Sequence, residues 1–521
     1  MGRIRVLVPA ALSVTSAGLF ALSFPTARWT ALSWVALAPL FAALRQGSTR
    51  QALFLAWLWC VAGACAAGSW FPRAVADYFH QSLGVALLLF VGVFTLMAAP
   101  YLMAFAAVYR ALARRIGPLS LPLLAAAAWT AAELGRGRLF TGTPFFIGNP
   151  WALAGYAHAQ NLPLLQIASV TGIYGVSFAV ACVNAAAAEA WLAWRGRERP
   201  LRSALGGLAL SALLALAMLA HGHAVLRGPA PGAESPPVEI ALVQGNVSIG
   251  TRWRSDLYGQ NLDVYLEFTR AAAAQGRPAI VFWPEAAMTF FLEREPLYRA
   301  AVASVTRPHD VELVAGAPRA LGEGDLPLYT NSIYSLAPDG EIRGRYDKQY
   351  LVPFAEYFPL RIDVMRRRFG RIRSFEPGRE TEPIPTRAGP AGVLVCNEAM
   401  LPEVAAERVA QGAVLLVNPS NDTWISDPQY SEQQLDIASL RAIEQRRYLV
   451  RASTSGPSAV IDPLGRILAR TRPLEPGFAL AEVRAVRDVS VYGRVGDLFG
   501  GACAAAVAGA LALRRVASKR R

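Results

Sequence analysis

Long apolar segments dominate the first 220 residues of this chain and restrict what it can fold into. We count seven of them, at residues 5–25, 29–44, 52–71, 83–109, 119–134, 164–194 and 204–220. A segment of about 20 apolar residues is long enough to cross the hydrocarbon core of a bilayer. The whole chain is 54% hydrophobic and only 17% charged, which excludes an ordinary soluble protein. The sequence therefore predicts a bundle of seven membrane spans within residues 1–225.

An eighth apolar segment, residues 498–513, precedes a basic C-terminal tail, so residues 491–521 are expected to form a last span and its cytoplasmic end. Arginine is concentrated in alternate connections, at Arg3, Arg5, Arg45, Arg50, Arg110, Arg114, Arg115, Arg195, Arg197, Arg199 and Arg202. The intervening connections contain only Arg28, Arg73, Arg136 and Arg138. Because cytoplasmic loops carry the excess of basic residues, we expect both termini to be cytoplasmic and the region after the seventh segment to be extracytoplasmic.

The formal net charge of +14 could also indicate a nucleic-acid partner. However, the arginines lie at the ends of apolar segments and do not form a basic face interleaved with aromatic residues. Membrane topology explains the charge, and we expect no nucleic-acid binding.

The composition changes at residues 226–237, a stretch rich in Pro and Gly that is typical of a linker. In residues 238–490, short runs rich in β-forming residues alternate with helical patterns at residues 257–274 and 429–445. We expect strands at residues 238–243, 279–282, 312–315, 332–336, 392–395, 413–417, 449–453, 459–461 and 478–483. This pattern predicts an α/β domain of ample size for one core.

Three chemically active side chains follow apolar runs of this domain. Glu285 follows the run at residues 279–284, Lys348 follows the segment at residues 342–346, and Cys396 ends the run at residues 392–395. A thiol needs a base to become a nucleophile, and a fixed cation can stabilise the oxyanion that its attack produces. The ends of covered strands are places where such groups can converge. An inert, buried cysteine is the alternative interpretation of Cys396 by itself.

The other cysteines, Cys60, Cys65, Cys182 and Cys503, all lie in apolar segments. Cys396 therefore has no soluble partner for a disulfide, and no Cys/His spacing of the zinc type is present in the sequence. We expect neither a metal nor a cofactor.

The motifs Trp283-Pro-Glu285, Tyr346-Asp-Lys348 and Val395-Cys396-Asn-Glu398, in this order, resemble the Glu, Lys, Cys triad of the carbon-nitrogen hydrolase (nitrilase) superfamily. The stretches at residues 351–359 and 492–497 resemble its membrane branch, the apolipoprotein N-acyltransferases. The resemblance covers essentially the whole chain. It implies a multi-span α-helical membrane bundle of about eight transmembrane helices that carries an α/β nitrilase-like αββα sandwich.

The resemblance also implies residue roles. Glu285 would be the general base, Lys348 the oxyanion stabiliser and Cys396 the nucleophile, with Glu356, Glu398 and Asn331 as supporting residues. For Glu356 the alternative is a surface ion pair with one of Arg366 to Arg368. One departure is Asn397, where members of the family often have an aromatic residue directly after the cysteine.

The reaction implied by the resemblance is transfer of an acyl chain from a membrane phospholipid, phosphatidylethanolamine being expected, through a cysteine thioester. The acceptor is the N-terminal amine of a diacylglyceryl-cysteine in an apolipoprotein, at the extracytoplasmic face of a bacterial inner membrane. Because water must be excluded from the thioester, apolar residues near the motifs are candidates for a cover. These are Phe290, Phe354, Tyr357, Phe358 and Trp424, for which ordinary core packing is the alternative.

Two other functions remain open at this stage. A membrane-anchored amidase or nitrilase would need the same triad but only one anchor, whereas a transporter or scaffold with a dead hydrolase domain predicts a broken triad. Two local features are also open: Glu189 is either functional or pairs with Arg195, and the helix at residues 429–445, with Arg441, Glu444 and Arg447, is expected to be solvated or substrate-facing.

Overall fold

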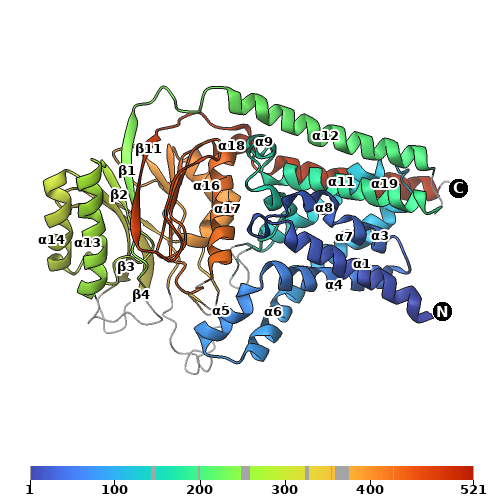
Figure 1. Cartoon of the computed structure of the whole chain (residues 1–521), viewed down its shortest axis with the longest axis horizontal. Coiled ribbons are helices and arrows are strands. Elements are labelled where there is room, and N and C mark those ends of the chain that lie inside the picture. Colours follow the sequence, from blue (N-terminus) through green and yellow to red (C-terminus); the bar gives the residue numbers. More distant parts are fainter. Residues whose placement is uncertain are drawn as a thin grey trace.

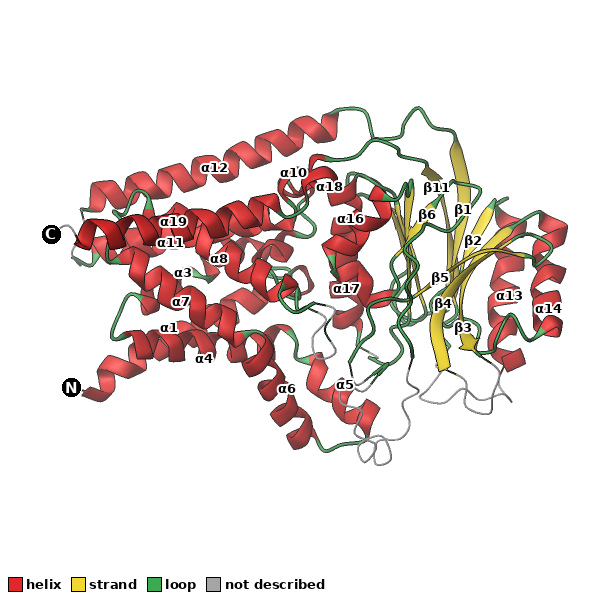
Figure 2. Ribbon diagram, turned by 180° about the vertical axis from the view of Figure 1, so that it is seen from behind, coloured by secondary structure: helices red, strands yellow, loops and turns green. Residues whose placement is uncertain are grey.

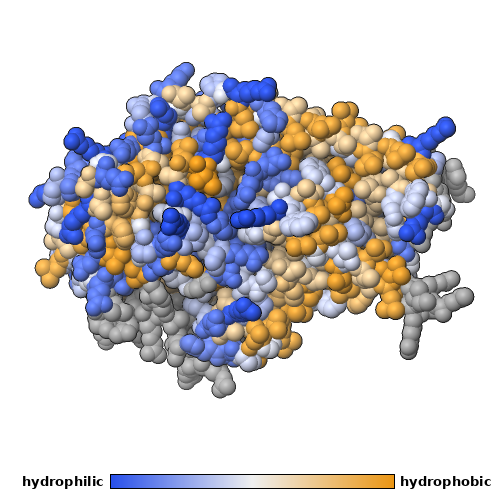
Figure 3. Space-filling model, viewed as in Figure 1, coloured by the Kyte–Doolittle hydropathy of each residue, from blue (hydrophilic) through white to orange (hydrophobic). Residues whose placement is uncertain are grey.

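The computed structural model describes residues 2–141, 143, 148–196, 200–247, 258–322, 328–353, 355–357, 375–425 and 427–519. A helical bundle forms one end of the molecule and an α/β domain forms the other (Figure 1). Both chain termini lie at the far end of the bundle, away from the α/β domain (Figures 1 and 2). Hydrophobic residues cover much of the bundle, whereas hydrophilic residues gather over the α/β end (Figure 3).

The bundle contains all the helices that precede the first strand, together with the last helix of the chain. They are α1 (Gly2–Leu22), η1 (Pro25–Ala27), η2 (Thr30–Leu32), α2 (Ser33–Ala36), α3 (Ala38–Leu44), α4 (Thr49–Ala67), α5 (Trp70–Phe79), α6 (Leu83–Met97), α7 (Ala99–Ala113), α8 (Leu121–Arg138), η3 (Ala154–His158), α9 (Leu162–Leu165), α10 (Ala168–Thr171), α11 (Ile173–Trp194), α12 (Leu201–Arg227) and α19 (Leu498–Lys519).

Among the described residues, three helices are long and apolar enough to cross a membrane, namely α4, α11 and α12. The pair α6 and α7, bent by 46°, adds a fourth if it is one span. Shorter apolar helices lie at residues 7–22, 30–44, 162–171 and 498–512. These lengths support a membrane bundle but do not by themselves give eight spans.

Three expected continuous segments are broken. Pro100 near the start of α7 interrupts the segment at residues 83–109, since proline has no N–H to donate to the preceding turn. The segment at residues 29–44 divides into η2, α2 and α3, with Pro39 at the start of α3. The segment at residues 164–194 divides into the end of α9, the short helix α10 and the long helix α11, and Gly172 with φ +64° separates α10 from α11.

The α/β domain contains two sheets. Its strands are β1 (Pro237–Gln244), β2 (Ile280–Phe282), β3 (Glu312–Leu321), β4 (Leu328–Leu336), β5 (Ile342–Asp347), β6 (Ala391–Val393), β7 (Leu415–Ser420), β8 (Leu449–Ser453), β9 (Ala459–Ile461), β10 (Ile467–Arg470) and β11 (Gly477–Arg484). In the described residues the order is β11-β1-β2-β3-β4-β5 in one sheet and β10-β9-β8-β7-β6 in the other. The β1–β2–β3 and β6–β7–β8 pairs are parallel, with antiparallel strands beside them.

Helices cover the outer face of each sheet. α13 (Tyr258–Gln275) and α14 (Pro296–Thr306) lie on one side, and α16 (Pro402–Ala410) and α17 (Pro428–Gln445) lie on the other (Figures 1 and 2). One apolar cluster, which includes Leu242, Phe282, Val393 and Val417, lies between the sheets. The expected αββα sandwich is therefore confirmed as the architecture of the α/β domain.

Of the two alternatives for helix α17, the solvated surface was wrong. The helix lies between the second sheet and the bundle, and Arg441 and Glu444 on it are fully buried (Figure 1). Its residue Gln433 hydrogen-bonds with Trp70 Nε1 at 3.1 Å and with the carbonyl oxygen of Ala67 at 3.0 Å. The helical period alone could not show this, because α17 is buried on both sides.

Candidate functional site

Glu285 lies directly beyond the carboxyl end of β2, in a loop where Ala286 has φ +52°. Its carboxylate is buried and accepts hydrogen bonds from two segments: Asn331 Nδ2 at 2.6 Å from Oε1, and the backbone N–H of Asn421 at 2.8 Å from Oε2. Burial raises the pKa of Glu285 and nearby Glu356 raises it further, whereas the Lys348 ammonium lowers it. The net upward direction makes the carboxylate a stronger base.

Lys348 follows β5 and is almost completely buried. Its Nζ lies 3.0 Å from Glu356 Oε1 and 3.4 Å from Glu285 Oε1. Burial lowers the pKa of Lys348, but the two carboxylates more than offset this and hold it above its usual value. The lysine is therefore a fixed cation between two anions.

Asn331 and Glu356 complete this group. The side-chain amide of Asn331, on β4, donates to Glu285 and also to Glu356 Oε1 at 3.1 Å, so it ties the two carboxylates together. The second oxygen of Glu356 accepts from Val352 N at 2.7 Å. Residues 366–368, the alternative partners of Glu356, lie outside the described residues.

Cys396 begins a short 3-10 helix, η6 (Cys396–Met400), that follows β6, and its φ is +51°. Burial raises the pKa of the thiol to about 12; the carboxylate of Glu285 raises it further, and the ammonium of Lys348 lowers it. Conversely, Cys396 is among the groups that raise the pKa of Lys348. The structure therefore brings the three triad candidates into one electrostatic cluster, from three strands and both sheets.

Glu398 connects the cysteine turn to the loop that follows β5. Its carboxylate accepts from Tyr346 Oη at 2.9 Å, from Gln349 N at 2.8 Å and from Val395 N at 2.7 Å. It is fully buried, and burial raises its pKa. Glu398 therefore holds the cysteine turn against the segment that carries Lys348.

The cover candidates have different surroundings. Phe290 is buried in the core between the first sheet and α13, where it stacks on Tyr298 at 4.5 Å between ring centroids. Tyr357 is half-buried one residue after Glu356, and half-buried Trp424 contacts Tyr430 and Tyr78 of α5. Phe354 and Phe358 lie outside the described residues. Phe290 is therefore packed in the core, which is the alternative interpretation given for it.

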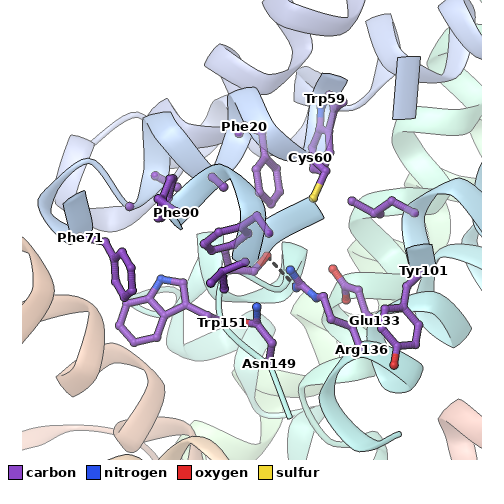
Figure 4. A pocket seen from close by; sticks show the side chains of 18 of the residues that line it. Phe20, Trp59, Cys60, Phe71, Phe90, Tyr101, Glu133, Arg136, Asn149 and Trp151 are labelled. Carbon is purple, nitrogen blue, oxygen red and sulfur yellow. Dashed lines mark hydrogen bonds between the residues drawn. The ribbon is translucent and has the colours of Figure 1, made fainter. Parts of the chain in front are cut away.

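An apolar cavity of about 210 Å³ lies in the bundle beside the candidate site. Phe20, Trp59, Phe71 and Phe90 form apolar walls, and Glu133, Arg136 and Asn149 form a polar part (Figure 4). Met400, the last residue of the cysteine turn η6, also lines it. Sequence reasoning missed this cavity because its lining comes from helices far apart in the chain.

An aromatic group packs against the lining of this cavity. Tyr430 contacts Trp70 at 4.6 Å and Trp151 at 5.9 Å between ring centroids, and both tryptophans line the cavity. Burial raises the pKa of Tyr430, and Cys396 raises it further. The sequence places Tyr430 on a predicted helix. This position alone does not distinguish an aromatic residue near the site from one in the core.

Glu189, within α11, pairs with Arg45 and not with Arg195. The distance between Glu189 Oε1 and Arg45 Nε is 3.4 Å, and Tyr109 Oη lies 3.3 Å from the same oxygen. The alternative of a pair with Arg195 was wrong, because α3 packs against α11 and Arg45, which directly follows α3, lies closer.

Two family models match the two parts of this chain. Residues 16–186 match the family model of the apolipoprotein N-acyltransferase N-terminal domain, and residues 239–488 match that of carbon-nitrogen hydrolase. Among solved structures, the nitrilase-superfamily member Nit3 of Saccharomyces cerevisiae is 20% identical, with a TM-score of 0.38, over 48% of this chain and 90% of that chain.

Two curated relatives are similar over most of their length. The apolipoprotein N-acyltransferase of Geobacter metallireducens is 34% identical over 514 residues, which are 97% of this chain and 95% of that protein. The apolipoprotein N-acyltransferase of Azotobacter vinelandii is 32% identical over 88% of this chain and 86% of that protein. Since the similarity includes both the bundle and the α/β domain, the chain belongs to the apolipoprotein N-acyltransferase family.

Proposed function

We propose that this protein transfers an acyl chain from a membrane phospholipid to the N-terminal α-amine of a diacylglyceryl-cysteine in an apolipoprotein. In this proposal Cys396 is the nucleophile, Glu285 the general base and Lys348 the oxyanion stabiliser. The observation that carries it is the cluster of Glu285, Lys348 and Glu356 around the buried cysteine turn, which lies directly against an apolar cavity of the bundle.

In the first step Glu285 takes the thiol proton while the sulfur of Cys396 attacks the ester carbonyl of the phospholipid. A thiol whose pKa is raised to about 12 is almost entirely protonated at neutral pH, so this base is required. The developing oxyanion is stabilised by the ammonium of Lys348. Collapse of the intermediate breaks the ester C–O bond, and Glu285 returns its proton to the leaving lysophospholipid alkoxide.

In the second step the amine of the diacylglyceryl-cysteine attacks the thioester carbonyl. Glu285 removes a proton from the attacking amine, the C–S bond breaks, and the proton passes to the sulfur of Cys396. The products are an amide and the free thiol. Water competes with the amine for the same thioester, and the burial of Glu285, Lys348 and Cys396 favours the amine by limiting water access.

Both substrates in this proposal are lipids, and the bundle supports that assignment. Large apolar side chains are exposed on α6 and α12, for example Leu88 (73% exposed), Leu96 (78%) and Leu213 (63%). Such a surface suits hydrocarbon and would be unfavourable in water. The cavity that Met400 lines offers an acyl chain an apolar space next to the cysteine turn.

The proposal also includes a topology. Residues 1–225 supply seven spans, residues 226–237 a linker, residues 238–490 the catalytic domain outside the cytoplasm, and residues 491–521 the last span with a basic cytoplasmic tail. The distribution of arginine supports this arrangement in a bacterial inner membrane. Confinement of both substrates to one leaflet would then place them beside the site at high local concentration.

The experiment is to trap the intermediate. Purified protein mixed with phosphatidylethanolamine and no acceptor should gain one acyl chain, measured by intact mass, that neutral hydroxylamine removes and diacylglyceryl peptide consumes. Cys396→Ala should gain none, while Cys503→Ala should behave like the parent because Cys503 lies in α19, away from the cluster. Acylation that persists in Cys396→Ala would refute the covalent mechanism. If phosphatidylglycerol were the sole efficient donor, the proposal of phosphatidylethanolamine as the donor would be refuted.

A further inference from the structure

The turn that begins at Cys396 keeps its backbone conformation only because contacts from its surroundings hold it. Cys396 is a non-glycine residue with φ +51°, an unfavourable conformation that persists only where surrounding contacts hold it. Glu398 supplies such contacts from the α/β domain. Asn418 adds another, because its side-chain amide donates to the carbonyl oxygen of Cys396 at 3.2 Å.

Arg441, on α17 of the α/β domain, contacts the same turn from the face of the domain that lies against the bundle. Its side chain is fully buried, and Nη1 donates to the carbonyl oxygens of Ala399 at 3.4 Å and Met400 at 3.3 Å. Its other terminal nitrogen, Nη2, lies 2.7 Å from Glu444 Oε2.

Glu444 continues this contact into the bundle. Its Oε1 accepts from the backbone N–H of Ile173 at 3.0 Å, at the first residue of α11. Two buried side chains thus connect the end of the cysteine turn with the start of a candidate membrane span.

Arg138, at the end of α8, makes a second connection. Its Nη1 lies 2.6 Å from Oε2 of Glu403, which is in the first turn of α16 directly after the cysteine turn. Its Nη2 lies 2.5 Å from Oδ2 of Asp497, next to the start of α19. Tyr492 Oη donates to the other oxygen of Asp497 at 2.7 Å. The segment from Ala399 to Glu403 is therefore held by Arg441, whose partner Glu444 bonds to the bundle, and by Arg138, which belongs to the bundle.

We propose that Arg441 and Arg138 are positioning residues that hold the Cys396 turn in its reactive orientation by tying it to the bundle. This inference rests on the proposed role of Cys396 as nucleophile. It means that the α/β domain is competent for acylation only while it is docked on the bundle, because α11 holds Arg441 through Glu444, and Arg138 of α8 holds Glu403 directly after the turn. The bundle then orients the nucleophile as well as anchoring the domain.

Two variants of the full-length protein test the proposal. Arg441→Lys keeps the charge, but a single ammonium cannot reach both carbonyls and Glu444 together. Glu403→Gln keeps the side-chain shape and removes the charge that pairs with Arg138. We expect each to lower the single-turnover rate of thioester formation at saturating phosphatidylethanolamine by about 10-fold or more, because small displacements of a reacting group have effects of this size. The lipid concentration at half-saturation should change less than about twofold, since binding is not affected.

A second measurement does not depend on lipid transfer. The rate at which iodoacetamide alkylates Cys396, followed by peptide mass as a function of pH, should rise in both variants and shift to lower pH, because a loosened turn exposes the thiol to water. Arg494→Gln is the matched control: Arg494 is an exposed arginine of the same junction, and both readouts should equal those of the parent.

Three outcomes are distinguishable. Parent-level thioester formation in both Arg441→Lys and Glu403→Gln overturns the positioning role. Equal slowing in Arg494→Gln also overturns it, because the effect would then belong to the junction in general. Thioester formation that persists in Cys396→Ala refutes the proposed function instead, and the alkylation profiles still report whether the two arginines order the turn.

Discussion

The ammonium of Lys348 lies closer to Glu356 than to Glu285, at 3.0 Å against 3.4 Å. Glu356 follows Lys348 by only eight residues, and its second oxygen is held by the backbone of Val352. The lysine is thus anchored mainly by a carboxylate of its own loop. This leaves the longer contact, with Glu285, as the one that can change when Glu285 takes a proton.

Lys348→Arg should lower thioester formation by about 10²-fold or more, the size of effect seen when one oxyanion donor is lost. A planar guanidinium has a different reach and cannot occupy the same point between the two carboxylates. Rapid-quench measurement of the acyl-enzyme would check this. Arg343→Lys, an exchange in the opposite direction at an exposed position of β5, serves as the control. Near-parent activity of Lys348→Arg would mean that the lysine is only a structural ion pair.

Glu285→Gln should abolish most acylation, with a loss of about 10²- to 10⁴-fold, because an amide cannot accept the thiol proton. The two side chains have nearly the same volume, so the melting temperature should remain close to that of the parent. Glu293→Gln is the matched control, since Glu293 is a partly exposed acid of the following segment that pairs with Arg345. If Glu285→Gln formed the thioester at the parent rate, another group would have to be the base.

Asp436 on α17 should make stability fall as pH rises. Burial and neighbouring Glu432 raise its pKa from 3.8 to about 7, although a hydrogen bond from Gln160 and the charge of Arg470 lower it. Between these two values the folded protein retains a proton that the unfolded chain has lost. The contribution to stability is therefore complete below the unfolded pKa and is lost as pH rises towards about 7.

Asp436→Asn removes this dependence. The melting temperature of the variant minus that of the parent should be a few degrees higher at about pH 8 than at about pH 5. Thermal unfolding in detergent at both pH values measures the difference. Asp263→Asn, at an exposed position of α13, should show no such gain. Parallel melting curves for parent and Asp436→Asn would contradict the upward shift.

The topology is tested with reporters that are active only outside the cytoplasm. A fusion after Pro237 should be active, whereas fusions after Arg115 and after Arg521 should be inactive, because arginine alternates between the connections. Activity is read in intact cells, with immunoblots to equalise expression. A silent reporter at Pro237 would place the α/β domain in the cytoplasm, where the proposed lipoprotein acceptor is absent.

Local pattern in the sequence was sufficient for the apolar segments, for most strands of the α/β domain and for the order of Glu285, Lys348 and Cys396 along the chain. These features depend on hydropathy, on short-range periodicity and on motifs within a few residues, all of which are written locally. Strand β10 and helices α14 and α16 were not predicted, and the apolar segments appeared continuous where Pro100 and Gly172 break them.

Only the tertiary structure decided which residues meet. Asn331 joins Glu285 to Glu356 because β4 lies two strands from β2 in the same sheet, a neighbourhood that no local pattern contains. Burial of Arg441 and Glu444 depends on docking of α17 against the bundle. The polarity of these two side chains therefore led to the wrong expectation of a solvated helix. Hydropathy reports how one segment partitions between water and a core, whereas contacts between distant charges depend on strand order and on the packing of two domains.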